Sequence, residues 1–369
     1  MVDISRAILQ QDDEVILDRD TFEARLINVC PDGQDELAIF DGFSSSSGVI
    51  VAQMAFGGNG FYDAARKRMR IDDAEWPLIW IQGDVCPGTH VSGTQAFVLG
   101  NASIHRIWLG DRVVGSMWSD ADADYCLLAG ILPTNLAASR SDQTLNSFEQ
   151  IESALHTVGM DFSHVVRTWF YLDNLLDWYG EFNAARDMFF HSRGVFDHLV
   201  PASTGIGGGN PASAALSSGA LAIRPRNSRV RAREVLSPLQ CSAIDYRSSF
   251  SRAVEIEFPD RRLLMVSGTA SIAPEGESLY ADDVAKQIHL TLDVVEAILK
   301  SRGMDWIHTM RGIGYFCDLA AFPIFEACCK ERGIPQLLLI AAHAIVCRAD
   351  LLFEIELDAM IATPAQGLG

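Results

Sequence analysis

Two arginine–tyrosine pairs in the sequence could bind an anion. Arg167 precedes Tyr171 by four residues, and Arg311 precedes Tyr315 by the same interval, in segments rich in β-forming residues. Residues four apart on a strand point to the same face. Because a planar guanidinium makes two charge-assisted hydrogen bonds to a carboxylate, we predict that Arg311, Tyr315 and Arg167 bind a carboxylated substrate. A structural salt bridge or a solvated strand face would also explain these arginines.

Glu354 is the candidate catalytic acid. It opens the sequence Glu354-Ile355-Glu356, so the two glutamates share one face of a strand. The preceding residues 351–353 are apolar, and such surroundings raise the pKa of a carboxyl group until it can donate a proton near neutrality. We expect the Glu354 carboxyl to face the Arg311 guanidinium across an apolar cleft. A strand glutamate held in an ion pair would fit the same pattern.

Two short segments supply further candidates for substrate binding. One ends a predicted strand at Gly268, where glycine lets a ligand approach backbone N–H groups, although a plain turn explains it nearly as well. The other lies close to Glu354 and includes His343, which could act as a base or could be a core histidine. No base partner is identifiable that would make Cys347 a nucleophile. The predicted residues are Ser267, Gly268, Thr269, His343, Cys347 and Arg348.

An internal repeat indicates which elements position these residues. Residues 143–171 and 287–315 agree without gaps at a constant offset of 144, which indicates one domain duplication. In each copy an apolar stripe of helical spacing precedes a glycine, Gly159 or Gly303, and a β-rich segment follows. The flanking pattern predicts an α+β unit, with two helices on one face of a mixed sheet.

The repeat also predicts the domain boundaries. We place an N-terminal extension at residues 1–94, the first unit at 95–232 and the second, site-bearing unit at 233–369. The extension contains strand-like runs at 49–54 and 78–82, and we expect it to pack on the first unit.

Composition narrows the classes of partner. The net charge of −19, from 29 basic and 48 acidic residues, opposes binding to phosphate backbones, so we expect no nucleic-acid partner. No run approaches the roughly 18 apolar residues of a membrane span, and the N-terminus lacks a secretory pattern, so we expect a cytoplasmic protein with no membrane partner. The eight cysteines are scattered without zinc spacing, and the glycines at 205–209 lack the lysine of a phosphate-binding loop. We predict no metal and no cofactor.

Several segments of the sequence resemble the RidA/YjgF superfamily. Residues 167–171, 179–190 and 201–207 are similar to its strand, helix and proline-led strand. Residues 250–253, 266–272 and 347–356 are similar to the chorismatase branch, whose members consist of two tandem RidA-like units. The resemblance implies chorismate-mutase-like α+β units around a pseudo-threefold axis, ligand pockets between units, and a homotrimer.

The sequence also departs from the deaminases of this superfamily. They bind substrate carboxylate with an arginine two residues after the loop proline, where this chain has Ser203 and Leu337. The family glutamate is matched by Glu354 in the second copy and by nothing in the first, which is therefore degenerate. Chorismatases also keep the glutamate and change the arginine, and they vary their reaction outcome near His343.

The resemblance implies a chorismatase-like hydrolysis. In such a reaction Glu354 protonates the enolpyruvyl group of an enol ether such as chorismate, water attacks the cation, and pyruvate leaves. Two other functions stay open: a RidA-type imine or enamine deaminase, and a non-catalytic metabolite-binding or scaffolding protein. A ribonuclease fits poorly with a charge of −19.

Overall fold

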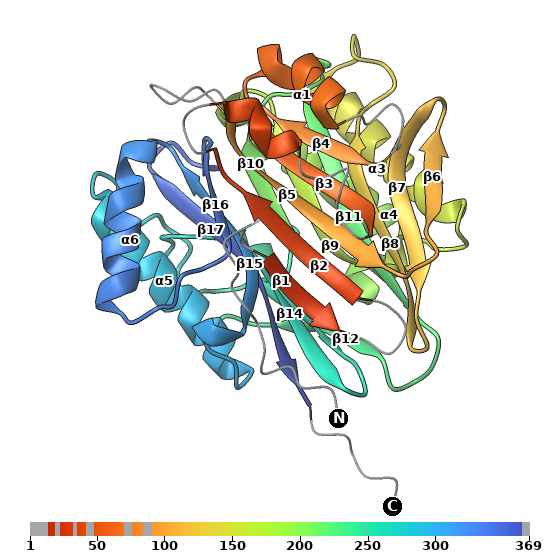
Figure 1. Ribbon diagram of the computed structural model, residues 1–369. Coiled ribbons are helices and arrows are strands. Elements are labelled where there is room, and N and C mark those ends of the chain that lie inside the picture. Colours follow the sequence, from red (N-terminus) through yellow and green to blue (C-terminus); the bar gives the residue numbers. More distant parts are fainter. Residues whose placement is uncertain are drawn as a thin grey trace, which may run out of the picture.

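Three mixed β-sheets form the protein, with the longest helices on their outer sides (Figure 1). The computed structural model describes residues 14–18, 23–31, 35–41, 48–69, 76–83, 91–246 and 248–363. Within these ranges no helix is long and apolar enough to cross a membrane.

The second sheet contains the first copy of the repeat. Its strands lie in the order β10-β9-β11-β8-β7-β6, with β9 and β10 parallel and the other pairs antiparallel. Helices α3 and α4 pack on one face through a phenylalanine-rich core that includes Phe148 and Phe190. The elements are β6 (His105–Leu109), β7 (Arg112–Ser119), β8 (Ala123–Ile131), α3 (Arg140–His156), β9 (Val165–Leu172), α4 (Tyr179–Ser192), β10 (Ala202–Gly207) and β11 (Leu216–Pro225).

The third sheet contains the second copy and has the same topology. Its order is β12-β13-β14-β17-β15-β16, with β15 and β16 parallel, and α5 and α6 cover its outer face. The predicted α+β unit is therefore confirmed in both copies. The elements are β12 (Arg231–Val235), β13 (Ala253–Glu257), β14 (Arg261–Ala270), α5 (Val284–Ser301), β15 (Thr309–Phe316), α6 (Phe322–Glu331), β16 (Leu339–His343) and β17 (Phe353–Ala362).

Residues shared by the two copies have the same local roles. Asp161 with His164, and Asp305 with His308, form capping boxes that start a short 3₁₀ turn before the central strand. Gly159 and Gly303 follow the first helix with φ values of 69° and 68°, which favour glycine. The two copies therefore share the same turn between the first long helix and the strand that follows it.

The N-terminal residues form a sheet of their own, which corrects the expectation of an extension. Its strand order is β1-β2-β5-β3-β4, with the parallel pair β3 and β4 at one edge. The strand that comes last along the chain, β5, lies in the middle of the sheet, as the last strand does in the other two sheets. A short 3₁₀ helix, η1 (Glu36–Phe40), lies where the other units have their first long helix. The remaining elements are β1 (Glu14–Asp18), β2 (Glu23–Val29), β3 (Val49–Gly57), α1 (Tyr62–Met69), β4 (Leu78–Ile81) and β5 (Val91–Gly100).

Both predicted domain boundaries fall inside strands of the structure, so the observed units begin and end at other residues. The boundary at residues 94 and 95 lies inside β5, which pairs with β2 and β3 of the first sheet. The boundary at residues 232 and 233 lies inside β12, which pairs with β13 of the third sheet. A short apolar run is compatible with several strand partners, so the sequence alone did not indicate which sheet these residues join.

The three sheets close into a ring around one axis. The edge strand β4 packs against β8, β10 against β14, and β16 against β5. Phe56, Tyr171 and Tyr315, from equivalent positions of the three central strands, meet at this axis: the Phe56 ring lies 6.2 Å from each tyrosine ring, and the tyrosine hydroxyls are 3.1 Å apart. The homotrimer stays a prediction, but one chain already supplies all three members of such a ring.

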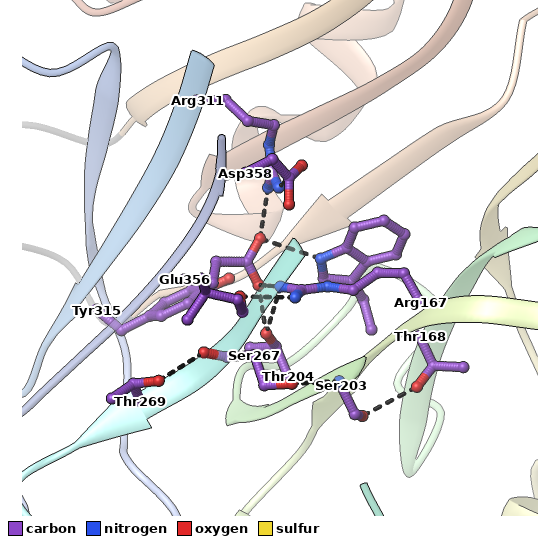
Figure 2. A network of polar contacts seen from close by, with 12 residues as sticks. Arg167, Thr168, Ser203, Thr204, Ser267, Thr269, Arg311, Tyr315, Glu356 and Asp358 are labelled. Carbon is purple, nitrogen blue, oxygen red and sulfur yellow. Dashed lines mark hydrogen bonds and ion pairs between the residues drawn. The ribbon is translucent and has the colours of Figure 1, made fainter. Parts of the chain in front are cut away.

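A buried ion network ties the second sheet to the third beside this axis. Glu356 of β17 accepts hydrogen bonds from Arg167 and Arg311, which approach it from two sides (Figure 2). Trp169 and Thr204 also donate to its carboxylate. Arg167 and Glu356 have no solvent-exposed side-chain surface.

The charges of this network balance one another. The second guanidinium, Arg311, also pairs with Asp358 at 2.7 Å, so two arginines face two carboxylates. Burial alone would raise the pKa of Glu356, but Arg167 and Arg311 outweigh burial and lower this pKa to about 2. Glu356 is therefore ionised in the fold.

Replacing this carboxylate should destabilise the fold strongly. We expect Glu356→Gln to reduce the free energy of unfolding by about 3–5 kcal/mol, because two buried guanidiniums lose their shared counter-charge. The matched control is Glu326→Gln, which changes an exposed glutamate of α6. Denaturant unfolding at neutral pH measures both variants.

The stability of the wild-type protein and that of Glu356→Gln should also respond differently to acid. The folded pKa of Glu356 is below its ordinary value of 4.5, so its stabilisation is present above pH 4.5 and is lost as the pH falls toward 2. The Gln variant should lack this loss. A change in unfolding free energy below about 1 kcal/mol would show that the network does not hold the sheets together.

Candidate active site

Three carboxyl side chains form a row on one face of β17. Glu354, Glu356 and Asp358 alternate along the strand, so all three point to the same side. Asp358 pairs with Arg311, and Glu356 pairs with both arginines of the axis. Glu354, at the other end of the row, lines a separate cavity of about 180 Å³.

This cavity lies between the second and third units. One wall comes from α4 and β10, and the opposite wall comes from β14, β17 and the segments before β13 and β17. Its charged lining residues are Arg186, Arg252, Arg348 and Glu354. In a chain of net charge −19 this is a strongly cationic environment.

The carboxyl group of Glu354 is buried, and its pKa lies above the ordinary value. The residue is 5% exposed, and the carboxyl forms no hydrogen bond with the part of the chain that the structure describes. Burial raises its pKa to about 8, and the neighbouring charge of Glu356 adds to this rise, while Arg252 and Arg167 oppose it. A group with this pKa can hold a proton at pH 7 and still give it up during a reaction.

The three arginines reach the cavity from different elements. Arg186 on α4 donates to Asn183 at 2.6 Å, and Arg252 donates to the Cys241 carbonyl at 3.0 Å. Arg348, in the segment before β17, donates to the Gly276 carbonyl at 2.7 Å. Guanidinium groups held around one cavity suit a ligand with more than one carboxylate.

Gly268 allows Glu354 to occupy its position. A Cβ atom built on residue 268 would overlap Oε1 of Glu354 and would also contact Thr204 at 3.4 Å. The β14–β17 ladder is irregular here, between Val266 and Thr269, which brings the Gly268 backbone against the carboxyl. A glycine at this position therefore keeps the acid directed at the cavity.

Four of the predicted site residues meet at this cavity: Glu354, Gly268, Cys347 and Arg348. Burial raises the pKa of the Cys347 thiol to about 12, and the charge of Glu354 acts in the same direction. Cys347 therefore remains a thiol at neutral pH, and its contribution to the cavity is steric and weakly polar.

Arg311, Arg167 and Tyr315 are placed elsewhere. Arg311 donates to Gln95, Glu356 and Asp358, and Arg167 donates to Glu356, Thr204 and the Val266 carbonyl. Tyr315 is fully buried and bonds Tyr171. The expected cleft between Arg311 and Glu354 is therefore not formed. Arg311 does lie on the same face of the sheet as Glu354, but the residue opposite it on the neighbouring strand is Asp358.

Ser267, Thr269 and His343 also lie outside the Glu354 cavity. The buried Ser267 accepts a hydrogen bond from the Ser203 amide and donates to the Ser251 carbonyl, so it fastens β10 to β14. Thr269 donates to the Ser267 carbonyl. His343 lies at the end of β16, where its Nε2 is 2.9 Å from the Cys317 carbonyl, and it lines a different cavity beside Gly207.

The sequence interpretation missed Arg186 and Arg252. Tyr179, Asn183 and Arg186 have helical spacing and all line the cavity, so their shared helix face was a usable signal. Arg252 precedes β13 in irregular structure and carries no periodic signal. Ser203 lines the same cavity.

The corresponding positions of the other two units carry no acid. The strand partner of Tyr315 is Glu354, the partner of Tyr171 is Ser217, and the partner of Phe56 is Gly93. Among these three equivalent positions, only the third unit has a carboxyl group. Within the described ranges, no three His, Cys, Asp or Glu side chains gather closely enough to hold a metal ion.

Comparisons with known proteins agree with this architecture. The sequence matches no protein-family model and no curated protein. The solved structure of a chorismatase superposes with a TM-score of 0.63 at 14% identity, covering 92% of this chain and 98% of that one.

Shorter solved proteins match about a third of the chain. A YjgF/YER057c/UK114 family member from Mycobacterium tuberculosis is 24% identical over 36% of this chain and 100% of its own, with a TM-score of 0.29. The YjgF gene product of E. coli is 22% identical over 34% of this chain and 97% of its own, also with a TM-score of 0.29. The chain therefore has the fold of the solved chorismatase structure.

Proposed function

We propose that this protein is a chorismatase-like hydrolase that cleaves a small carboxylated enol ether, such as chorismate, in the Glu354 cavity. The observation that carries the proposal is a buried carboxyl group, whose pKa burial raises to about 8, in a cavity lined by three arginines. The fold shared with a chorismatase supports it. The cationic lining selects a carboxylated substrate, and the protonated acid selects a reaction that begins with proton transfer.

The proposed reaction balances with water alone. Arg186, Arg252 and Arg348 bind the carboxylates and hold the enolpyruvyl group against Glu354. Glu354 protonates the methylene carbon, which leaves a cation at the carbon that carries the ether oxygen. Water adds there and returns a proton to Glu354, and the resulting hemiketal breaks its ether bond to release pyruvate and the ring alcohol.

The buried ion network keeps the acid ready for this step. Glu356 remains charged two residues away, and its negative potential disfavours ionisation of Glu354. Because Arg167 and Arg311 balance the charge of Glu356, its pKa stays low and it remains ionised. One carboxyl is therefore kept ionised and its neighbour protonated, which assigns the two glutamates separate roles.

Removing the acid should slow turnover strongly. With chorismate as substrate, we expect the purified protein to release pyruvate and Glu354→Gln to lower kcat by about 10²–10⁴-fold, because the amide cannot donate the proton. The control Glu326→Gln should retain the full rate. Pyruvate is measured with a coupled enzyme.

Any other result of this assay would contradict a specific part of the proposal. Release by both proteins at equal rates would contradict the role of Glu354. No release by either would defeat the substrate assignment, and ammonia release from fresh 2-imino acids would then favour the deaminase. A ligand-induced rise in Tm without any turnover would favour the non-catalytic binding protein.

The pH profile should report the same acid. Since burial raises the folded pKa of Glu354 to about 8, kcat should fall as the pH rises through about 8. The residual activity of Glu354→Gln should lack this descending limb. A wild-type rate that is flat or rising between pH 7 and 9 would contradict a protonated Glu354 as the catalytic acid.

Stability should change over the same pH window without any substrate. The folded pKa of Glu354 is above its ordinary value of 4.5, so this residue's contribution to stability is fully present below pH 4.5 and is lost as the pH rises through about 8. Wild-type unfolding free energy should therefore decline more steeply across this range than that of Glu354→Gln.

A methyl group at residue 268 should disturb the acid without removing it. We expect Gly268→Ala to lower kcat by at least about tenfold, because the new Cβ would overlap Oε1 of Glu354 and turn the carboxyl away. Gly60→Ala is the matched control, since no atom lies within 4 Å of a Cβ built there. Full activity of Gly268→Ala would show that the orientation of Glu354 does not matter.

A further inference from the structure

A further cavity, of about 220 Å³, lies between all three sheets. Each sheet supplies part of its wall: Leu26 and Phe97 come from the first, Trp118 and Tyr125 from the second, and Met265 from the third. It is separate from the Glu354 cavity and shares no lining residue with it.

Stacked aromatic rings form one side of this central cavity. The rings of Trp118 and Tyr125 are 5.2 Å apart and nearly parallel at 9°, and Phe97 and Phe258 extend the surface on either side. Such rings offer flat apolar area to another aromatic ring.

Methionines form another large part of the lining. Met54, Met265, Met310 and Met360 line the cavity, out of ten methionines in the chain. Methionine side chains adapt their shape and make favourable contacts with aromatic rings, so this wall can adjust to an occupant.

Small residues keep the cavity open. Ala24, Ala52 and Ala129 line it at positions where a larger apolar side chain would fill the space. An empty apolar cavity loses packing contacts and destabilises a fold. A cavity of roughly 150 Å³ already binds benzene, so this one has room for a larger ring system.

The charged groups at the cavity already have counter-charges. Arg311 pairs with Glu356 and Asp358, and Arg261 pairs with Asp260 and lies over the Phe258 ring. A charged ligand would lose its hydration here without gaining a free counter-charge. The cavity therefore favours an uncharged occupant.

We propose that this central cavity is a second ligand site, which binds a neutral aromatic molecule of one or two rings. The proposal does not depend on the reaction at Glu354. Asp358 and Arg311 at its wall belong to the ion network that contains Glu356, two residues from Glu354.

Methionine methyl resonances test the site directly. With [¹³C-methyl]methionine in the full-length protein, we expect indole to shift the resonances of Met54, Met265, Met310 and Met360 through ring currents. Met160 and Met304, which are buried in the cores of the second and third units and do not line the cavity, serve as internal controls. Indole-3-carboxylate, with the same ring and a negative charge, should bind at least about tenfold more weakly.

Filling the cavity should block binding. Leu263→Trp adds a bulky side chain at the cavity wall and should remove the indole-induced shifts, while unchanged Met160 and Met304 resonances report an intact fold. If Leu263→Trp does not fold, Ala52→Leu makes the same test from the first sheet. The proposal would be overturned if millimolar indole shifted no methionine resonance or shifted only those of the controls. It would also be overturned if indole-3-carboxylate bound as tightly as indole, or if a folded variant with a filled cavity still bound indole unchanged.

Discussion

The structure depends on one buried carboxylate shared by two guanidinium groups. Glu356 holds Arg167 of the second unit and Arg311 of its own unit at the axis where the three sheets meet. Taking these charges out of water costs free energy, which is offset only if every partner is present in the right geometry. The network therefore ties the relative position of two units to a single side chain. It also adds the negative potential that helps keep Glu354 protonated in the adjacent cavity.

The three units have diverged around this common frame. Their sheets share one strand order, with one edge strand fewer in the first, yet the position occupied by Glu354 in the third unit is Ser217 in the second and Gly93 in the first. Among these three equivalent positions only the third unit has an acid, and this acid lies in the candidate active site. The first unit, with η1 where the others have a long helix, still supplies Phe56 to the axis and Gln95 to Arg311.

Part of the candidate site was predictable from local pattern. The apolar residues before Glu354 correctly indicated a raised pKa, and the neighbouring positions 347 and 348 do line its cavity. The assignment of Arg167 and Arg311 to substrate failed for a physical reason. Alternation along a strand specifies the face of a side chain, but not which group on another sheet lies opposite it. Both arginines face Glu356, the salt-bridge alternative that the same pattern allowed.

The sequence by itself determined the repeat, the two helix-bearing units and the strand that carries Glu354, because helix caps, apolar periodicity and turn glycines act between residues close along the chain. Only the tertiary structure decided that the N-terminal strands β1 to β5 form a sheet of their own, that Arg186 and Arg252 join Glu354, and that an apolar cavity lies between the three sheets. These features join residues tens to hundreds of positions apart. Their contacts arise from how whole sheets pack, and no local spacing encodes that arrangement.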